Sequence, residues 1–332
     1  MRRSLLLILL LLAGAAQAKD ACPALRSRLS DADAATRVAA VACNEHMIWY
    51  RAFIDRNGRL ANSTVMESEN RLLGDGVSPA WRRVADYWRE SGLMPRMRGF
   101  AGADACESAM AGAGYAAAGC RAFVVDHAWS AAFISWVLMK AQVPGFRPSA
   151  SHIDYVRHAW ITPQNSAYEY RALAHARPTA GDMLCYVRGR ETLGYDGLLS
   201  IVQNRSGGLN MHCEIVVAAN PDNDSTAYLI GGNVQQGVTM RLLPLNRNGE
   251  LWNLPTGVIS ENACTPDTDS ACNFNQKDWA VWLKLKSPGE LASLPPPRPM
   301  TASLMPAPAA PKCCINCVVG AGVPRCPSEE NP

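Results

Sequence analysis

The pattern of apolar residues changes its period near residue 180, and this change constrains the fold more than any other feature of the chain. Before it, a buried helical stripe recurs at the i, i+3, i+4 and i+7 positions, occupied by Trp81, Val84, Ala85 and Trp88. After it, short apolar runs are bounded by turn residues, which is typical of strands. Helices followed by strands predict an α+β fold in which helices pack on an antiparallel sheet.

Four segments in the second half have the strand pattern. They are GDMLCYVR (181–188), HCEIVVAA (212–219), AYLIGGNV (227–234) and VTMRLLPL (238–245). The sequence NPDNDS between the second and the third is a strong turn signal. A fifth segment, DWAVWLKLK (278–286), fits a strand or a helix equally well.

The segment DHAWSAAFISWVLMKAQ (126–142) predicts an amphipathic helix with Ser130 near its start. A serine at this place is either a plain helix cap or a nucleophile served by the free N–H groups and the dipole of the helix end. The residues alone leave both alternatives open. The preceding run 99–119 is rich in Gly and Ala, and we predict a loop closed by a disulfide between Cys106 and Cys120. Cys264 and Cys272 are a second local pair.

Residues 1–18 have the organisation of a secretory signal peptide. Arg2 and Arg3 give a positive start, Leu5–Leu12 form an apolar run too short to span a membrane, and Ala16-Gln17-Ala18 offers small residues for cleavage. The expected mature protein begins near Lys19, has no membrane span, and is periplasmic or secreted. Its 12 cysteines fit an oxidising compartment and suggest disulfide bonds.

The charge and composition of the remaining chain define two further parts. Without Arg2 and Arg3 the formal net charge falls from +3 to +1, so no basic field favours nucleic acid. Residues 19–286 are predicted to form the α+β domain, with helices in their N-terminal part. Residues 287–332 are rich in Pro and Ala and are predicted to be an unpacked tail. The tail cysteines (313, 314, 317 and 326) are expected to form disulfides within the tail or to a protein partner.

Three residues suit acyl-transfer chemistry, which needs a nucleophile, a base, a group that orients the base, and donors for an oxyanion. Ser130 lies at a helix start, His212 opens a strand from which a base can project, and Asn233 ends the next strand, where it can orient the imidazole. Asn233 follows two glycines, so a role in a turn is the alternative.

Further polar residues lie near these in the sequence. Asp126, Trp129 and His152 are candidates for substrate contacts, and Asp126 or His152 is an alternative base. No H-E-x-x-H or comparable pair is present, so neither a metal site nor a cofactor is predicted. Strand alternation turns Cys213 away from the face of His212, which makes Cys185 and Cys213 a core pair or a disulfide.

The helix and strand motifs together carry a family resemblance. AWSAAFISWVLMKAQV (128–143) resembles the helix of the CHAP and NlpC-type cell-wall amidases and endopeptidases, and GDMLCYV, HCEIVV and IGGNV resemble their strand series. The W-S-A-A-F-I-S-W helix more closely resembles the helix of a bacterial domain-of-unknown-function family, number 2272. The similarity covers roughly 35–245. This chain has Ser where the amidases have their nucleophilic Cys.

The resemblance implies a papain-like α+β fold with Ser130 as nucleophile, His212 as base and Asn233 as the orienting residue. It implies an exported cell-envelope hydrolase that cleaves an amide bond of peptidoglycan, with peptidoglycan or its peptide stems as the partner. A serine hydroxyl is far less acidic than a thiol and needs a well-aligned base. The alternative is a non-catalytic module that uses the same groove to bind cell-wall peptide or a protein. Esterase chemistry is a third reading.

Overall fold

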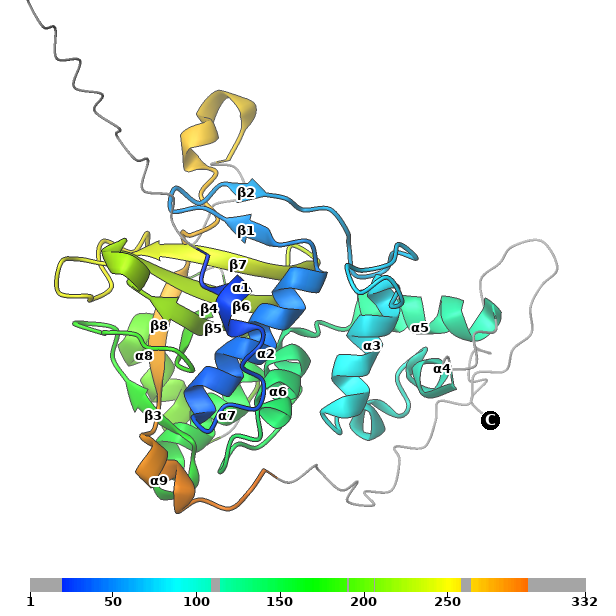
Figure 1. Ribbon diagram of the computed structural model, residues 1–332, viewed down its shortest axis with the longest axis horizontal. Coiled ribbons are helices and arrows are strands. Elements are labelled where there is room, and N and C mark those ends of the chain that lie inside the picture. The colour runs from blue at the N-terminus through cyan, green and yellow to red at the C-terminus, as the bar shows by residue number, and fades with distance from the viewer. Residues whose placement is uncertain (1–19, 109–113, 190, 206, 258–263, 298–332) are drawn as a thin grey trace, which may run out of the picture.

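The computed structural model describes residues 20–108, 114–189, 191–205, 207–257 and 264–297. The expected signal peptide and the four cysteines of the tail lie outside these residues. The described part forms one mixed sheet with helices packed against it. A second group of helices lies beside the helices that contact the sheet (Figure 1).

The helices of the described part are α1 (Cys22–Leu25), α2 (Ala34–Ile48), α3 (Ala80–Glu90), α4 (Ala103–Ser108), α5 (Gly114–Asp126), α6 (Ser130–Lys140), α7 (His152–Ile161), α8 (Gly194–Gln203) and α9 (Pro288–Ala292). The strands are β1 (Ala52–Ile54), β2 (Leu60–Ala61), β3 (Tyr168–Arg171), β4 (Met183–Val187), β5 (Met211–Ala219), β6 (Thr226–Val234), β7 (Gly237–Pro244) and β8 (Asp278–Leu285). Their order across the sheet is β2-β1-β7-β6-β5-β4-β8-β3.

The α+β fold predicted from the change of period is confirmed. The four strand segments are β4, β5, β6 and β7, and the ambiguous segment 278–286 forms strand β8. Neighbouring strands are antiparallel, as expected, except that β1 pairs in parallel with β7. Strands β1 and β2 come from a region that we expected to be helical. Tyr50 and Arg51, both at φ 61°, take the left-handed conformation after α2 and redirect the chain into the sheet.

The Gly- and Ala-rich run 99–119 is not the predicted loop, since it contains α4 and the start of α5. The expected disulfide between Cys106 and Cys120 is present and joins these two helices. The composition favours this arrangement, because alanine is a good helix former and small residues let two helices approach closely. A Cβ atom on Gly119 would lie 3.0 Å from the Cβ of Ala105.

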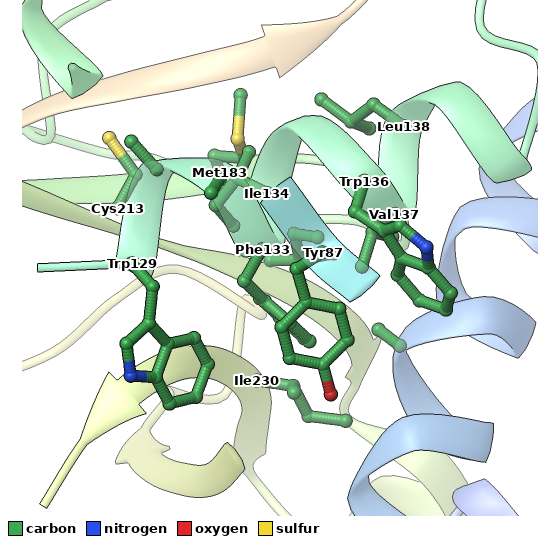
Figure 2. Close-up of a cluster of buried hydrophobic side chains, with 14 of the residues drawn as sticks. Tyr87, Trp129, Phe133, Ile134, Trp136, Val137, Leu138, Met183, Cys213 and Ile230 are labelled. Atoms are coloured by element: carbon green, nitrogen blue, oxygen red, sulfur yellow. The ribbon is translucent and has the colours of Figure 1, made fainter. Parts of the chain in front are cut away.

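Helix α6 is the buried centre of the molecule. Helices α2 and α6 lie against the face of β5, β6 and β7, and α3 packs on the other side of α6 (Figure 1). The ring of Tyr87 on α3 meets Phe133 of α6 edge-on, with 5.3 Å between centroids (Figure 2). Ile230 of β6 lies in the same cluster. Because α6 is apolar on nearly every side, its position is fixed from all directions.

Strand alternation divides β5 between two faces of the sheet. Cys213 and Ile215 belong to the large core beneath the helices. Val216 belongs to a smaller cluster on the opposite face, with Leu184 and Tyr186 of β4. His212 and Glu214 share the parity of Val216, so their side chains leave the strand on that second face.

Four disulfides lie within the described residues. Cys185 and Cys213 occupy paired positions of β4 and β5 and are bonded, which confirms one of the two readings of this pair. Cys264–Cys272 is also bonded, as predicted, and Cys22–Cys43 ties α1 to α2. These bonds are compatible with an extracellular or periplasmic protein.

The packed part of the chain extends beyond the expected domain boundary at residue 286. Ser287 caps α9 through a capping box with Glu290. Leu291 is buried, and Gly145 N–H donates to the carbonyl of Pro295. The segment 287–297 is therefore docked on the domain, although its composition predicted an unpacked tail. No single helix in the described ranges has both the length and the apolarity of a membrane span; the pair 116–126 and 130–140, bent by 101°, meets that criterion only together.

Candidate functional site

Ser130 is the first residue of α6, but its hydroxyl does not cap the helix. The N-cap position is Trp129, and no side chain caps this helix end. The Oγ atom of Ser130 instead lies 2.7 Å from Nε2 of His152. The Ser130 hydroxyl therefore does not act as a helix cap. It is hydrogen-bonded to an imidazole, in the geometry of a Ser-His pair.

His152 is the first residue of α7, and Tyr155 lies one turn further along the same helix. The hydroxyl of Tyr155 is hydrogen-bonded to Nδ1 of His152. Burial raises the pKa of Tyr155 well above its ordinary value, which keeps the phenol neutral. Burial, and then the positive charge of Arg188, lower the pKa of His152 to about 3. A neutral imidazole with its proton on Nδ1 can accept the proton of Ser130 at Nε2.

A cavity of about 330 Å³ opens at this pair. Its wall is formed by the two side chains together with Ala128, Ala150, Ser151, Arg188, Leu209, Asn210 and Met211. The first backbone hydrogen bond of α6 runs from Phe133 N–H to Trp129 O, at 2.9 Å. The N–H groups of Ser130, Ala131 and Ala132 precede it, and they are the donors that a helix start offers to a developing oxyanion.

His212, the base expected from the sequence, has other neighbours. Its Nδ1 atom lies 3.1 Å from a guanidinium nitrogen of Arg188. Its Nε2 atom lies 3.6 Å from Oε1 of Glu214 and has no hydrogen-bond partner among the residues that the structure describes. The His152 ring is near, with 5.2 Å between the two centroids. The structure thus places His212 behind His152, with no hydrogen bond to Ser130 in the described part of the chain.

Glu214 is held by a buried ion pair on the second face of the sheet. Arg241 of β7 donates to it twice, from Nε to Oε2 and from a terminal nitrogen to Oε1, both at 2.8 Å. Arg241 also donates to the Phe274 carbonyl and to Asn275 Oδ1. Both charges are buried, which costs desolvation free energy. The two aligned hydrogen bonds and the further bonds of Arg241 offset this cost. Burial, and then Arg188, hold the pKa of His212 well below its ordinary value.

Asn233, the expected orienting residue, serves the helix start rather than an imidazole. In the orientation that gives both of its polar atoms a partner, the amide donates to Glu67 Oε2 and accepts from the backbone N–H of Trp129, both at 3.2 Å. Trp129 Nε1 also donates to Glu67 Oε2, at 2.7 Å. Asn233 takes the left-handed conformation, with φ at 55°. It lies where the pairing of β6 with β7 shifts register, before the hairpin turn at residues 235–236, so it does not form the turn that its glycine neighbours suggested. Its amide instead fixes the residue before Ser130.

The remaining two candidates lie away from the cavity. Trp129 is completely buried and stacks on Trp49 and Tyr87, with centroids 5.9 and 5.6 Å apart. It is therefore a core residue, because such a ring has no surface to offer a substrate. Asp126 is exposed at the end of α5 and is not part of the cavity wall.

Sequence reasoning missed five residues of the site and its surroundings: Tyr155, Arg188, Glu67, Glu214 and Arg241. Tyr155 follows His152 by three residues, so helical spacing offered a signal. Glu214 and Arg241 stand inside apolar strands, and a charged residue in such a place indicates a buried pair. Glu67 comes from irregular backbone and carried no signal. In the described ranges, no group of three or more His, Cys, Asp or Glu side chains is arranged to hold a metal ion.

Comparison with known proteins assigns a family. The model of the family described as "uncharacterized protein conserved in bacteria (DUF2272)" matches residues 75–285, which is more than half of the chain. The matched residues include α6 and strands β3 to β8, so the chain is a member of a family of bacterial proteins. It belongs to the DUF2272 family. No curated protein and no solved structure matches it.

Proposed function

We propose that this protein is an exported cell-envelope hydrolase that cleaves an amide bond of peptidoglycan, with Ser130 as nucleophile and His152 as its base. One observation carries the proposal: Ser130 Oγ and His152 Nε2 are 2.7 Å apart at the wall of a cavity. Asn233 and Glu67 then have supporting roles, since they fix the residue before Ser130, and His212 packs against the ring of His152.

The steps follow from the geometry. Ser130 Oγ attacks the amide carbonyl carbon while its proton passes to His152 Nε2. The negative charge on the carbonyl oxygen is stabilised by N–H groups of the first turn of α6. The C–N bond then breaks, and the proton on Nε2 leaves with the amine. Water, deprotonated by the same nitrogen, hydrolyses the acyl-serine and returns Ser130. The phenol of Tyr155 holds the proton on Nδ1 throughout.

The choice of substrate is supported by two features. The order of a W-S-A-A-F helix followed by Gly-Asp, His and Asn-ending strands is similar to that of the papain-like cell-wall amidases. The signal-peptide pattern and the four disulfides are compatible with the compartment that contains peptidoglycan.

A non-catalytic binding module on the same fold is the second candidate, and three observations favour it. Ser130 is 5% exposed and His152 is 4% exposed. No carboxylate is hydrogen-bonded to His152 in the described part of the chain, and Arg188 disfavours the imidazolium that the reaction must form. A site of this kind binds cell-wall peptide without cleaving it.

Digestion of purified peptidoglycan, followed by separation of the released fragments, tests the proposal. The wild-type protein is expected to release peptides. Ser130→Ala and His152→Gln are each expected to abolish release, and the double variant should be no worse than either, because residues that act as one unit are not additive. Matched controls are Ser200→Ala on the exposed side of α8 and His175→Gln, whose side chain is 87% exposed.

The variant Ser130→Cys separates the two candidates. A thiol ionises more easily than a hydroxyl, so activity that arises in Ser130→Cys from an inert parent means that the base and the oxyanion donors are aligned. If neither wild type nor Ser130→Cys releases any product from peptidoglycan or ester substrates, while the protein still binds the wall, the hydrolase is rejected and the binding module stands.

A further inference from the structure

A second cavity, of about 460 Å³, lies on the sheet face opposite α6. Arg188 and Tyr186 from the end of β4, Arg241 from β7, and Lys277 beside the start of β8 contribute to its wall. The hairpin residues Gln235 and Gln236 close one side. The cavity is therefore bordered by cations and by amide groups, which are hydrogen-bond donors.

Three cations gather around a single ring in this cavity. Lys277 Nζ lies 5.6 Å from the centroid of Tyr186, and the guanidinium carbons of Arg188 and Arg241 lie 5.9 and 6.0 Å from it. Contact with the ring stabilises each cation, but the three charges repel one another. Such a concentration of like charge in a cavity is a mark of a binding site.

Only part of this charge is neutralised by the protein. Arg241 is paired with Glu214. Asp278 also borders the cavity, but its carboxylate accepts the N–H groups of Leu193 and Gly194, at 2.8 and 2.9 Å. Lys277 has no ion pair within the described residues. The bond from Arg188 to His212 occupies one of the five N–H donors of its guanidinium.

We propose that this cavity, which we name the Tyr186 pocket, binds an oxyanion, a carboxylate or a phosphate group, between Arg188 and Lys277. Both cations are then paired, and the amides of Gln235 and Gln236 supply further donors. A planar guanidinium and a point-like ammonium together can hold either anion.

The position of Arg188 connects the Tyr186 pocket to Ser130. Arg188 borders both cavities, so a ligand whose anionic group it holds can also extend to the Ser130–His152 pair. We therefore infer, resting here on the proposed function, that the substrate carries its anionic group close to the bond that is cut. Pairing of Arg188 also removes a charge that lowers the pKa of His152, so the ligand makes this base stronger.

Titration calorimetry of the full chain with inorganic phosphate and with acetate tests the site directly. One or both anions should bind, and the stronger of the two identifies the chemistry of the ligand. Arg188→Gln and Lys277→Gln should each weaken binding about tenfold, since a hydrogen bond to a charged group contributes on the order of a decade in affinity. The control is Lys284→Gln, because Lys284 also lies over an aromatic ring, the indole of Trp282, but outside the pocket.

The pH dependence provides a second readout. Burial, and then the charge of Arg241, lower the pKa of Lys277 to about 8, so the affinity for acetate, whose own charge is constant in this range, should fall as pH rises through that value. The other titratable groups facing Lys277 are Tyr186 from β4, His212 and Glu214 from β5, and its neighbour Asp278. Burial raises the pKa of Tyr186 and lowers that of His212, so both stay neutral in this range. Glu214 stays paired with Arg241. The Lys277→Gln variant should therefore lose this pH step.

The outcomes separate this inference from the proposed function. Ser130→Ala should bind both anions as the wild type does, so a protein that binds anions but releases nothing from peptidoglycan rejects only the hydrolase. If neither anion binds the wild type, or if Arg188→Gln and Lys277→Gln bind as tightly as Lys284→Gln, the oxyanion site is rejected whatever the hydrolysis assay shows.

Discussion

The rings of His152 and His212 lie side by side in the interior, with 5.2 Å between their centroids and 56° between their planes. Two imidazoles this close cannot both be charged, because two imidazolium ions would repel each other, and burial adds a desolvation cost to charging either one. Burial is the main cause that lowers the pKa of each. Acid is therefore expected to destabilise the folded state, because both imidazoles bind a proton more readily in the unfolded chain.

We first predict that His152 makes the protein lose stability as pH falls below 6.5. The imidazole binds a proton near pH 6.5 when unfolded but only near pH 3 when folded. The unfolded state therefore binds more protons between these values, and the free energy of unfolding decreases with falling pH. The expected loss from this one group is about 2 kcal/mol at pH 5. Urea titrations of wild type and His152→Gln at several pH values measure it.

The comparison of slopes isolates His152 from other groups. Burial raises the pKa of Glu67 and Asp182, which acts in the opposite direction, but this effect is common to both proteins. His175→Gln is the control, because an exposed imidazole should leave the slope unchanged. Identical slopes in wild type and His152→Gln would show that His152 is not held neutral by burial.

The second prediction concerns the pH dependence of the proposed activity. An ordinary histidine base gives kcat/KM an acid limb near its pKa of about 6.5, because kcat/KM reports the free enzyme. With a pKa of about 3 for His152, kcat/KM should show no limb between pH 7 and about 5 while the protein stays folded. If a bound anion pairs with Arg188, the limb in kcat should lie at higher pH than that in kcat/KM. A kcat/KM limb near pH 6.5 would point to a different base.

The sequence identified the elements of the site better than the contacts between them. Strands β4 to β7 follow from period and turn residues, which are local signals. Ser130 and both histidines were also recognised as polar residues in the right segments. Which histidine meets Ser130 depends on how α7 packs beside the end of β5, and that is set by contacts between residues far apart in the chain. Alternation correctly placed Cys213 opposite His212, but could not show that His152 would stand between His212 and Ser130.

The third prediction concerns the docked segment 287–297. Leu291 is 3% exposed, so Leu291→Ala should lower the free energy of unfolding by about 2–5 kcal/mol, the usual cost of truncating a buried leucine. Leu29→Ala is the matched control, because Leu29 is 44% exposed and should change stability by less than about 0.5 kcal/mol. Chemical denaturation measures both. Equal effects of the two variants would mean that α9 does not dock.

The fourth prediction concerns Gly231, which lies against the buried side chains of Glu214 and His212 on the second face of the sheet. A Cβ atom there would lie 2.8 Å from Glu214 Cγ and 3.0 Å from His212 Nε2. Gly231→Ala should therefore destabilise the fold by about 1–3 kcal/mol, the range for overpacking a close-packed interior. Gly289→Ala on α9 is the control, because its Cβ would meet nothing within 4 Å. A neutral Gly231→Ala would show that this face is loosely packed.

The last prediction concerns the hairpin tip at the Tyr186 pocket. Val234 pairs with Gly237, so Gln235 and Gln236 form a two-residue turn, and their φ angles of 53° and 60° are both left-handed. Asn-Gly is the sequence that such a turn favours, and glutamine is not suited to it. The double change Gln235→Asn and Gln236→Gly should therefore raise the free energy of unfolding by about 1 kcal/mol. Urea denaturation measures the gain, and unchanged or reduced stability would contradict it. If the two side chains serve the oxyanion, the same variant should also bind phosphate or acetate more weakly, which is the reason that a sequence would retain two glutamines in a conformation that does not suit them.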